Sequence, residues 1–321
     1  MHRRDVIQAT AGTLALAAVP AGLAQGAWPL RPVRLLVPTA AGGAIDVVSR
    51  LVSDVASRAL GQPVVVDNKP GSAQAIAINL ALNAAADGYT FIALSDNGLY
   101  QPLIRKGLGW SVENSFVPVS LLITQPMVIV VNASAGIASL QALVAKAKDG
   151  SLQYVVASAG SAQHLAGALL GKRAGFEWTP IPYKGGGAAI NDLAGGIVEI
   201  GILGPGPVLP HVKTGRLKIL ATTAPQRSPL LPGVPTVAES GFPGFEVVQW
   251  IGLFARAGTP VDAITRMQRE CAAAVTQVKS AALLQSLGMD AAGSTGAEFE
   301  ERIRKDAPVW SSQARSLGIG E

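Results

Sequence analysis

The sequence predicts an α/β protein built from two lobes, and three observations support this. Short apolar runs alternate with longer segments of helical periodicity along most of the chain. Glycine is abundant and aromatic residues make up only 5% of the residues, which suits closely packed helices and strands. The strands fall into two clusters, with connections near 124–127 and 249–253. We therefore expect each lobe to be a mostly parallel sheet flanked by helices, with the two lobes arranged as a clamshell.

Residues 1–27 are predicted to be an export signal that is removed from the mature chain. Arg3 and Arg4 form a basic start, a short apolar stretch follows, and small residues precede Trp28. The paired arginines also resemble a twin-arginine signal. No later stretch approaches the ~18 uninterrupted apolar residues of a membrane span. We therefore expect a periplasmic protein.

The composition argues against several classes of protein. The formal charge of +5 is spread along the chain, without a basic block, so we expect no binding to nucleic acid. One cysteine, Cys271, and three histidines cannot supply an ordinary zinc or iron site. Neither a dinucleotide fingerprint nor a phosphate-binding P-loop is present. We therefore expect no metal and no cofactor.

The first lobe is predicted to comprise residues 28–126 and 252–321. Its first strand is stopped by Pro38, and Gly61 ends the next helix because glycine tolerates the left-handed conformation of a helix terminus. The expected elements of this lobe are strands at 33–37, 64–66, 90–94 and 117–123, and helices at 44–60, 73–85, 260–278, 280–287 and 297–316.

The second lobe is predicted to comprise residues 127–251. The proline-rich stretches 225–235 and 242–244 are typical of surface loops. The expected elements are strands at 127–131, 152–157, 179–183, 197–203 and 217–222, helices at 138–148 and 161–170, a helix after Gly187, and a strand at 247–254 that leads back to the first lobe.

Three glycine-rich turns share one context, since each follows a predicted strand and opens a helix. They span 38–44, 157–161 and 182–187. The first turn of a helix presents unpaired N–H groups and positive potential, and glycine lets an anion approach the backbone. In open α/β sheets such loops line the crevice at the carboxyl ends of the strands. They therefore predict a carboxylate site that needs no arginine, unless they are only tight turns.

The candidate ligand residues come from these turns and from the end of the strand at 90–94. They are Thr39, Ala41, Gly42, Gly43, Ala44, Ser95, Asn97, Ser158, Gly160, Ser161, His164, Lys184, Gly185 and Gly186. Asp46 would repel an anion, so we expect it to turn away and hold the first loop.

Ser161 and His164 permit a second interpretation. Spaced i, i+3, they could be the nucleophile and base of an α/β hydrolase-like enzyme. The nucleophile-elbow pattern is absent and no acidic residue is evident to orient the histidine. We therefore expect no catalytic residue and treat His164 as a polar wall or a hydrogen-bonded packing residue.

Short segments in a fixed order resemble the Bug family, the TctC-like receptors of tripartite tricarboxylate transporters. The matching segments are Trp28 to Arg34, Val37-Pro38, Gly42-Gly43 with Asp46, Leu60 to Val66, Asn68 with Pro70-Gly71, Asp87 to Thr90, Phe116 to Ser120, His164 to Gly167, Pro182 to Gly185, Pro235 to Glu239, Gly252 to Ala255 and Gly258 to Pro260. The resemblance implies a periplasmic Venus-flytrap protein that closes on a carboxylate or dicarboxylate. It also implies that backbone amides and ordered waters hold the acid.

The resemblance further implies a partner in the membrane. Some members serve a tripartite transporter, and presentation to a membrane sensor is the other possibility; we expect the protein itself to be a monomer. One departure concerns Gly204, a candidate site residue, where members often carry an acidic or amide group near the end of the strand. Without that group a ligand ammonium lacks a partner, so we expect amino acids to bind less well than simple carboxylates, aromatic acids or dicarboxylates.

Overall fold

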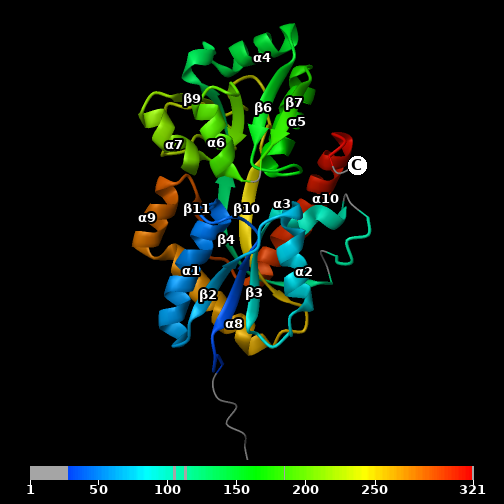
Figure 1. The fold of residues 1–321 in the computed structure, drawn as a ribbon, viewed down its shortest axis with the longest axis vertical. Coiled ribbons are helices and arrows are strands. Elements are labelled where there is room, and N and C mark those ends of the chain that lie inside the picture. The colour runs from blue at the N-terminus through cyan, green and yellow to red at the C-terminus, as the bar shows by residue number, and fades with distance from the viewer. Residues whose placement is uncertain (1–27, 104–105, 112–113, 184, 320–321) are drawn as a thin grey trace, which may run out of the picture.

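The computed structural model describes residues 28–103, 106–111, 114–183 and 185–319. It contains two β-sheets, each covered by helices on both faces, that form the lower and upper lobes of Figure 1. The two-lobed α/β fold predicted from the sequence is confirmed. The predicted export signal, residues 1–27, lies outside the described residues.

The lower lobe is a six-stranded sheet in the order β11-β4-β10-β3-β1-β2. Its strands are β1 (Val33–Val37), β2 (Val64–Asn68), β3 (Thr90–Ser95), β4 (Phe116–Pro126), β10 (Val248–Arg256) and β11 (Asp290–Ala291). Its helices are α1 (Ala44–Leu60), α2 (Ala75–Asn83), α3 (Asp96–Tyr100), α8 (Val261–Thr276), α9 (Val278–Ser286) and α10 (Gly296–Ser316), with 3-10 turns η1 (Ser72–Gln74) and η2 (Gln101–Leu103).

The upper lobe is a five-stranded sheet in the order β7-β6-β8-β5-β9. Its strands are β5 (Val128–Asn132), β6 (Leu152–Val156), β7 (Trp178–Pro182), β8 (Ile200–Leu203) and β9 (Leu217–Thr222). Its helices are α4 (Leu140–Asp149), α5 (Ala162–Ala174), α6 (Gly186–Ala194) and α7 (Pro205–Lys213), with a 3-10 turn η3 (Ala133–Ala135).

Both sheets are mixed rather than mostly parallel. β1 pairs in parallel with β2 and β3, and β6 pairs in parallel with β7 and β8. β10 is antiparallel to β3 and β4, and β5 is antiparallel to β8 and β9. The antiparallel strands are those next to the passages between the lobes. The chain leaves the lower sheet after β4 and returns to it in β10, so β10 runs opposite to its neighbours β3 and β4. In the upper sheet β5, which arrives from the lower lobe, runs opposite to β8 and β9.

Each strand contributes side chains to two hydrophobic cores, because successive side chains point to opposite faces of a sheet. In the lower lobe Leu35 packs under α1, α8 and α9, whereas Leu36 packs under α2, α3 and α10. In the upper lobe Ile129 packs under α4 and α5, whereas Val130 packs under α6 and α7. Both sheets are thus buried on both faces, which explains the continuous apolar runs in the sequence.

Two helices were not expected from the sequence. α3 begins at Asp96, where the Asn97-Gly98 pair suggested no more than a turn. α7 begins at Pro205 and contains Pro210, and its prolines hid it. Proline is tolerated at the start of a helix because the first N–H groups have no partner within the helix.

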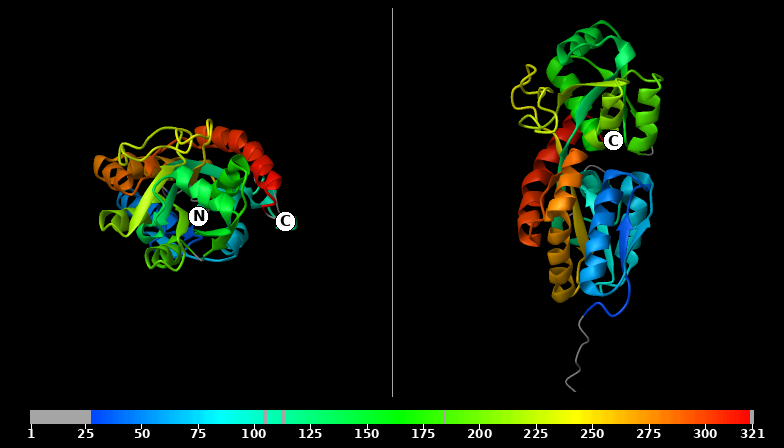
Figure 2. Two further views of the ribbon diagram at one scale, coloured as in Figure 1. Left: turned by 90° about the horizontal axis from the view of Figure 1, so that it is seen from above. Right: turned by 90° about the vertical axis from the view of Figure 1, so that its left-hand side faces the viewer.

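The two lobes are stacked along the long axis of the molecule, as the side view in Figure 2 shows. α10 runs along one side of the lower lobe and reaches the upper lobe, where it contacts α5. No helix in the described part of the chain is long and apolar enough to cross a membrane.

Candidate functional site

The glycine-rich turns lie on facing edges of the two sheets. β1, β2 and β3 run parallel, so their carboxyl ends share one edge of the lower sheet. β6, β7 and β8 likewise share one edge of the upper sheet. In Figure 1 the first edge is the upper end of the lower lobe and the second is the lower end of the upper lobe. The turn after β1 therefore faces the turns after β6 and β7 from the opposite lobe.

Direct contacts join these edges. A Cβ atom on Gly160, in the turn after β6, would lie 3.4 Å from Asn97 Oδ1 and 3.6 Å from Gln101 Nε2 of the lower lobe. Gly160 also has a φ of +70°, which favours glycine. Elsewhere along the same edges, Gly206 of α7 lies against Leu287, the C-cap of α9. The lobes thus touch at glycines, where the backbone carries no side chain.

The turn after β1 is held by Asp46, as predicted. Asp46 accepts hydrogen bonds of 2.9 Å from the Gly42 N–H, from Arg50 and from Asn68. Burial acts to raise the pKa of Asp46, but these hydrogen bonds outweigh it and hold that pKa below its usual value. The Gly42 amide is therefore already used, and the free groups of this turn lie at the start of α1.

The N-cap of helix α1 is Gly43, and no side chain caps this helix start. Gly43 is extended, with a φ of −76°, and a Cβ atom there would meet nothing closer than 3.6 Å. Thr39 lies beside it, with a buried hydroxyl that has no hydrogen-bond partner among the described residues. This end of α1 offers backbone N–H groups and a hydroxyl to an acceptor.

Gln74 joins the site although the sequence analysis did not include it. It lies in η1 with a φ of +77°, and its amide nitrogen donates to Ser95 Oγ at 2.6 Å. The Gln74 side chain lies so close to Gly98 that a Cβ atom on Gly98 would overlap the Gln74 amide. Gln74 is 8% exposed, and its oxygen has no partner among the described residues. In the sequence, Gln74 could have been noticed only as a polar residue shortly after Pro70-Gly71.

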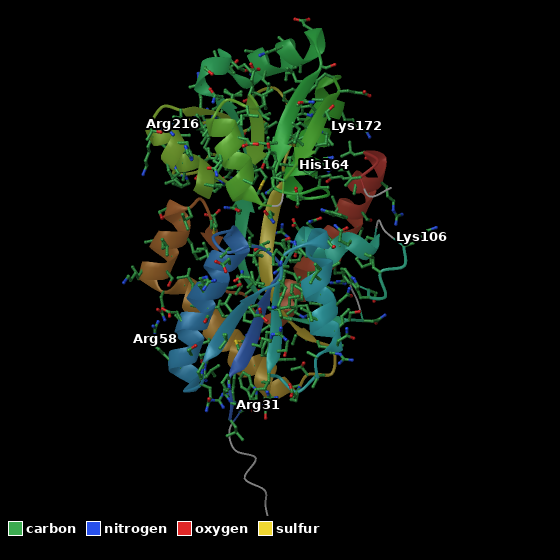
Figure 3. The ribbon with its side chains drawn as sticks, viewed as in Figure 1. Arg31, Arg58, Lys106, His164, Lys172 and Arg216 are labelled. Carbon is green, nitrogen blue, oxygen red and sulfur yellow. The ribbon has the colours of Figure 1, made fainter. Side chains whose placement is uncertain are left out.

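The turn after β6 is closed by its own side chains. Ser161 caps α5 by accepting from the His164 N–H at 3.3 Å, and its hydroxyl donates to the Ser158 carbonyl at 2.7 Å. The His164 ring accepts from the Gly160 N–H through Nδ1 at 3.1 Å. Burial lowers the pKa of His164, in keeping with a neutral ring. Figure 3 shows His164 at the lower end of the upper lobe.

The turn after β7 leads into α6, whose N-cap is Gly185 and lacks a side-chain cap. Gly185 has a φ of +141°, and neither it nor Gly186 has a neighbour within 4 Å of a Cβ position. Tyr183 anchors the turn by donating to Asp192 at 2.5 Å. Lys184, a predicted contact, lies outside the described residues.

The corner at Gly204 differs from expectation. A Cβ atom on Gly204 would lie 3.0 Å from Oε1 of Gln125, a side chain of β4 that is 2% exposed. The expectation that this corner lacks a polar group is therefore wrong, because the absence of a side chain at Gly204 leaves the space that the Gln125 amide fills. A ligand ammonium therefore does not lack a polar neighbour at this corner, and the reason for expecting amino acids to bind less well is removed.

The basic side chains described at the lower edge are paired, since Arg50 binds Asp46 and Lys69 binds Asp67. In Figure 3, Arg58, Lys172 and Arg216 lie at the outer sides of the lobes. Nor do the described residues contain a group of three or more histidine, cysteine, aspartate or glutamate side chains able to hold a metal ion. What the edges offer chemically is a set of backbone donors with hydroxyl and amide side chains, which suits an anion with acceptor oxygens.

Comparison with known proteins agrees with this chemistry. The model of the tripartite tricarboxylate transporter family receptor matches residues 48–311. Protein BugT of Bordetella pertussis strain Tohama I is 32% identical over 312 residues, which cover 95% of this chain and 95% of BugT.

Solved structures share the whole fold. Rpa4515 of R. palustris, solved with adipate, has a TM-score of 0.86 and 31% identity, over 91% of this chain and 99% of that one. MatC from Rhodopseudomonas palustris, solved with bound malate, has a TM-score of 0.82 and 26% identity, over 89% of this chain and 99% of that one. Both of these proteins were captured with a dicarboxylate.

Proposed function

The chain belongs to the tripartite tricarboxylate transporter receptor family, and we propose that it is a periplasmic receptor that captures a small carboxylate or dicarboxylate between its lobes. The adipate and malate bound by Rpa4515 and MatC support this ligand class.

The observation that carries this proposal is the capping of the helices. The N-caps of α1, α6 and α7 are Gly43, Gly185 and Gly204, and none of these helix starts has a side-chain cap. α4 and α10, which begin away from the facing edges, are capped by Ser139 and Thr295, but α8 is also uncapped, and α5 at the upper edge is capped by Ser161. The feature that α1, α6 and α7 share is a glycine N-cap. An uncapped helix start keeps its N–H groups available for an anion. The uncapped starts come from both lobes, so one ligand can bridge them.

Such a bridge gives a mechanism of capture. A carboxylate held by one lobe alone gains only part of the possible hydrogen bonds. When the lobes approach, the second set of donors binds the same ligand, and its higher affinity for the closed arrangement shifts the equilibrium toward closure. A membrane transporter or sensor that recognises the closed arrangement would complete the function.

We further propose that the protein catalyses no reaction. Ser161 donates to a backbone carbonyl and His164 Nδ1 accepts from a backbone amide, so both are engaged in holding the turn. The hydrolase interpretation needs a hydrogen bond from the serine hydroxyl to the histidine ring. Hydrolysis of ester substrates by the purified protein that disappears in His164→Ala would favour the enzyme instead.

The direct test is a ligand panel on the mature protein. Isothermal titration calorimetry with adipate and malate should show saturable binding, and bound ligand should raise the melting temperature. Adipamide, in which uncharged amides replace the carboxylates, is the matched control and should bind at least tenfold more weakly. Equal affinity for adipate and adipamide would contradict a site built for an anion.

A further inference from the structure

A cavity lies beside the face of α3 that carries Asp96 and Tyr100. It has a volume of about 310 Å³ and is lined by residues of α3, α5, α10 and the segment that enters β10. The residues that matter are Asp96, Tyr100, Trp250, Arg302, Asp306 and Trp310. Its volume is at the lower end of the range of about 300–1,000 Å³ for small-molecule sites.

This cavity is distinct from the candidate carboxylate site. Along α3 and the residue that follows it, Asn97 and Gln101 turn toward Gly160. Asp96 and Tyr100, spaced i, i+4 on a neighbouring face, line the cavity. None of the candidate carboxylate residues that the structure describes lines it.

The lining of the cavity carries more negative than positive groups. Three carboxylates, those of Asp96, Glu246 and Asp306, meet a single guanidinium, that of Arg302. Arg302 already pairs with Asp306 one turn away on α10. Asp96 is 5% exposed and accepts a hydrogen bond of 2.7 Å from the Asn97 N–H. It forms no ion pair with a described residue.

The burial of Asp96 has a measurable consequence. Burial, together with the nearby Asp306 carboxylate, raises the pKa of Asp96 to about 7. The carboxyl is therefore only partly ionised at neutral pH. A bound cation would favour its ionised form.

The walls of the cavity are aromatic. The Tyr100 ring lies 5.7 Å from the Trp250 ring and 5.5 Å from the Trp310 ring, measured between centroids. The Tyr100 hydroxyl and the Trp250 indole N–H lie beside each other without a hydrogen bond of normal geometry. The Trp310 N–H also has no partner among the described residues. Aromatic rings beside carboxylates are the usual surroundings of bound organic cations.

We propose that this cavity is a second ligand site, for a small organic ammonium ion. Its charge pairs with Asp96, and its alkyl part packs against Trp310 and Val309. Ala162 and Leu165 of α5 belong to the same wall, so the bound cation touches both lobes. The site shares no described residue with the candidate carboxylate site, and the proposal stands whether or not a dicarboxylate is the receptor's ligand.

Calorimetry with butylammonium as the probe tests this, with uncharged 1-butanol as its control. Butylammonium should bind and 1-butanol should not. Between pH 6 and pH 8 the affinity should rise about tenfold, as a group of pKa 7 ionises. Arg302, Asp306 and Glu246 also face the cavity, but the rise should belong to Asp96. Asp96→Asn should therefore lose at least tenfold in affinity and all of the pH dependence. An unchanged titration in that variant would overturn the proposal.

A second variant tests the site without changing Asp96, in case Asp96→Asn does not fold. Val309, 57% exposed, is on the cavity lining, whereas Val278, 88% exposed, is not. Val309→Trp should obstruct butylammonium and leave adipate binding unchanged, while Val278→Trp should change neither. Absence of butylammonium binding to the wild-type protein at millimolar concentration would refute the site. Loss of adipate binding alone would refute only the proposed function.

Discussion

Two adjacent glycines in the turn after β1 have different roles. Gly42 has a φ of +86° and donates to Asp46, so it shapes the turn. Gly43 has an ordinary extended conformation, and a Cβ atom there would make only ordinary contacts of 3.6 Å or more, so the fold does not require glycine there. A glycine that the backbone does not need is explained by close approach of another group, and we propose that this group is the ligand.

Gly43→Leu should therefore weaken dicarboxylate binding at least tenfold, about 1.4 kcal/mol, because the side chain covers the start of α1. Its free energy of unfolding should stay within about 0.5 kcal/mol of the wild type. Calorimetry and urea unfolding measure the two quantities. Gly150→Leu, also extended and in open space, is the control and should affect neither. Unaltered adipate affinity in Gly43→Leu would remove this turn from the site.

Gln74 stores backbone strain at the same edge of the lower lobe. Left-handed conformation costs a residue with a side chain about 1–2 kcal/mol, and Gln74 has a φ of +77°. Both Gln74→Ala and Gln74→Gly lose the hydrogen bond to Ser95, but only glycine relieves the strain. Gln74→Gly should be more stable than Gln74→Ala by about 1 kcal/mol in urea unfolding. Equal stabilities would mean that the conformation relaxes in the variants.

The sequence predicted where the backbone turns of the candidate site lie, but not which side chains from distant parts of the chain reach them. The glycine turns could be located because each stands between a strand and a helix. Gln125 reaches the corner at Gly204 across the passage between the lobes, and only the three-dimensional pairing of β4 with its neighbours reveals it. The seven aromatic and charged side chains that line the cavity beside α3 likewise come from three separate stretches of sequence.

At the scale of elements, the start of α5 links stability to pH. His164 is neutral in the fold, with a pKa below its usual value because of burial. His164 therefore binds a proton more readily in the unfolded chain than in the folded chain. The stabilising contribution is complete above the unfolded pKa of 6.5 and is lost as pH falls toward the folded pKa. Urea unfolding from pH 7.5 to pH 5 should show declining stability, with a smaller decline in His164→Gln. Identical pH profiles would contradict this.

The crossing strand β10 depends on a small residue. Gly252 lies against the ring of Phe299 from α10, and a Cβ atom at Gly252 would overlap that ring. Gly252→Ala should cost about 1–3 kcal/mol of stability, the usual range for overpacking a core. Adding Phe299→Leu should recover part of the loss. No change on Gly252→Ala would show that the ring has room to move.

The elements themselves were largely predictable, with understandable exceptions. Strands buried on both faces give clear apolar runs, and helices such as α8 give clear periodicity. α7 was hidden by its prolines, and α3 is too short for a periodic pattern. The mixed direction of the sheets could not be predicted, because it depends on how the chain passes between the lobes rather than on local pattern.

At the scale of the whole molecule, the chain passes twice between the sheets, after β4 and before β10. The division into lobes at 28–126 with 252–321 and at 127–251 stays a prediction about which segments move together. Small-angle scattering with and without adipate should reveal a smaller radius of gyration in the bound state. The two segments crossing between the lobes would then act as the hinge.

The central claim is that backbone amides from both lobes hold one carboxylate. Amide NMR of the uniformly ¹⁵N-labelled protein, titrated with adipate, tests it most directly. The amides at Gly43 in the lower lobe and at Gly185 and Gly186 in the upper lobe should shift together, along a single saturation curve. Saturable adipate binding that shifts the amides of only one lobe, or of neither, would contradict the claim.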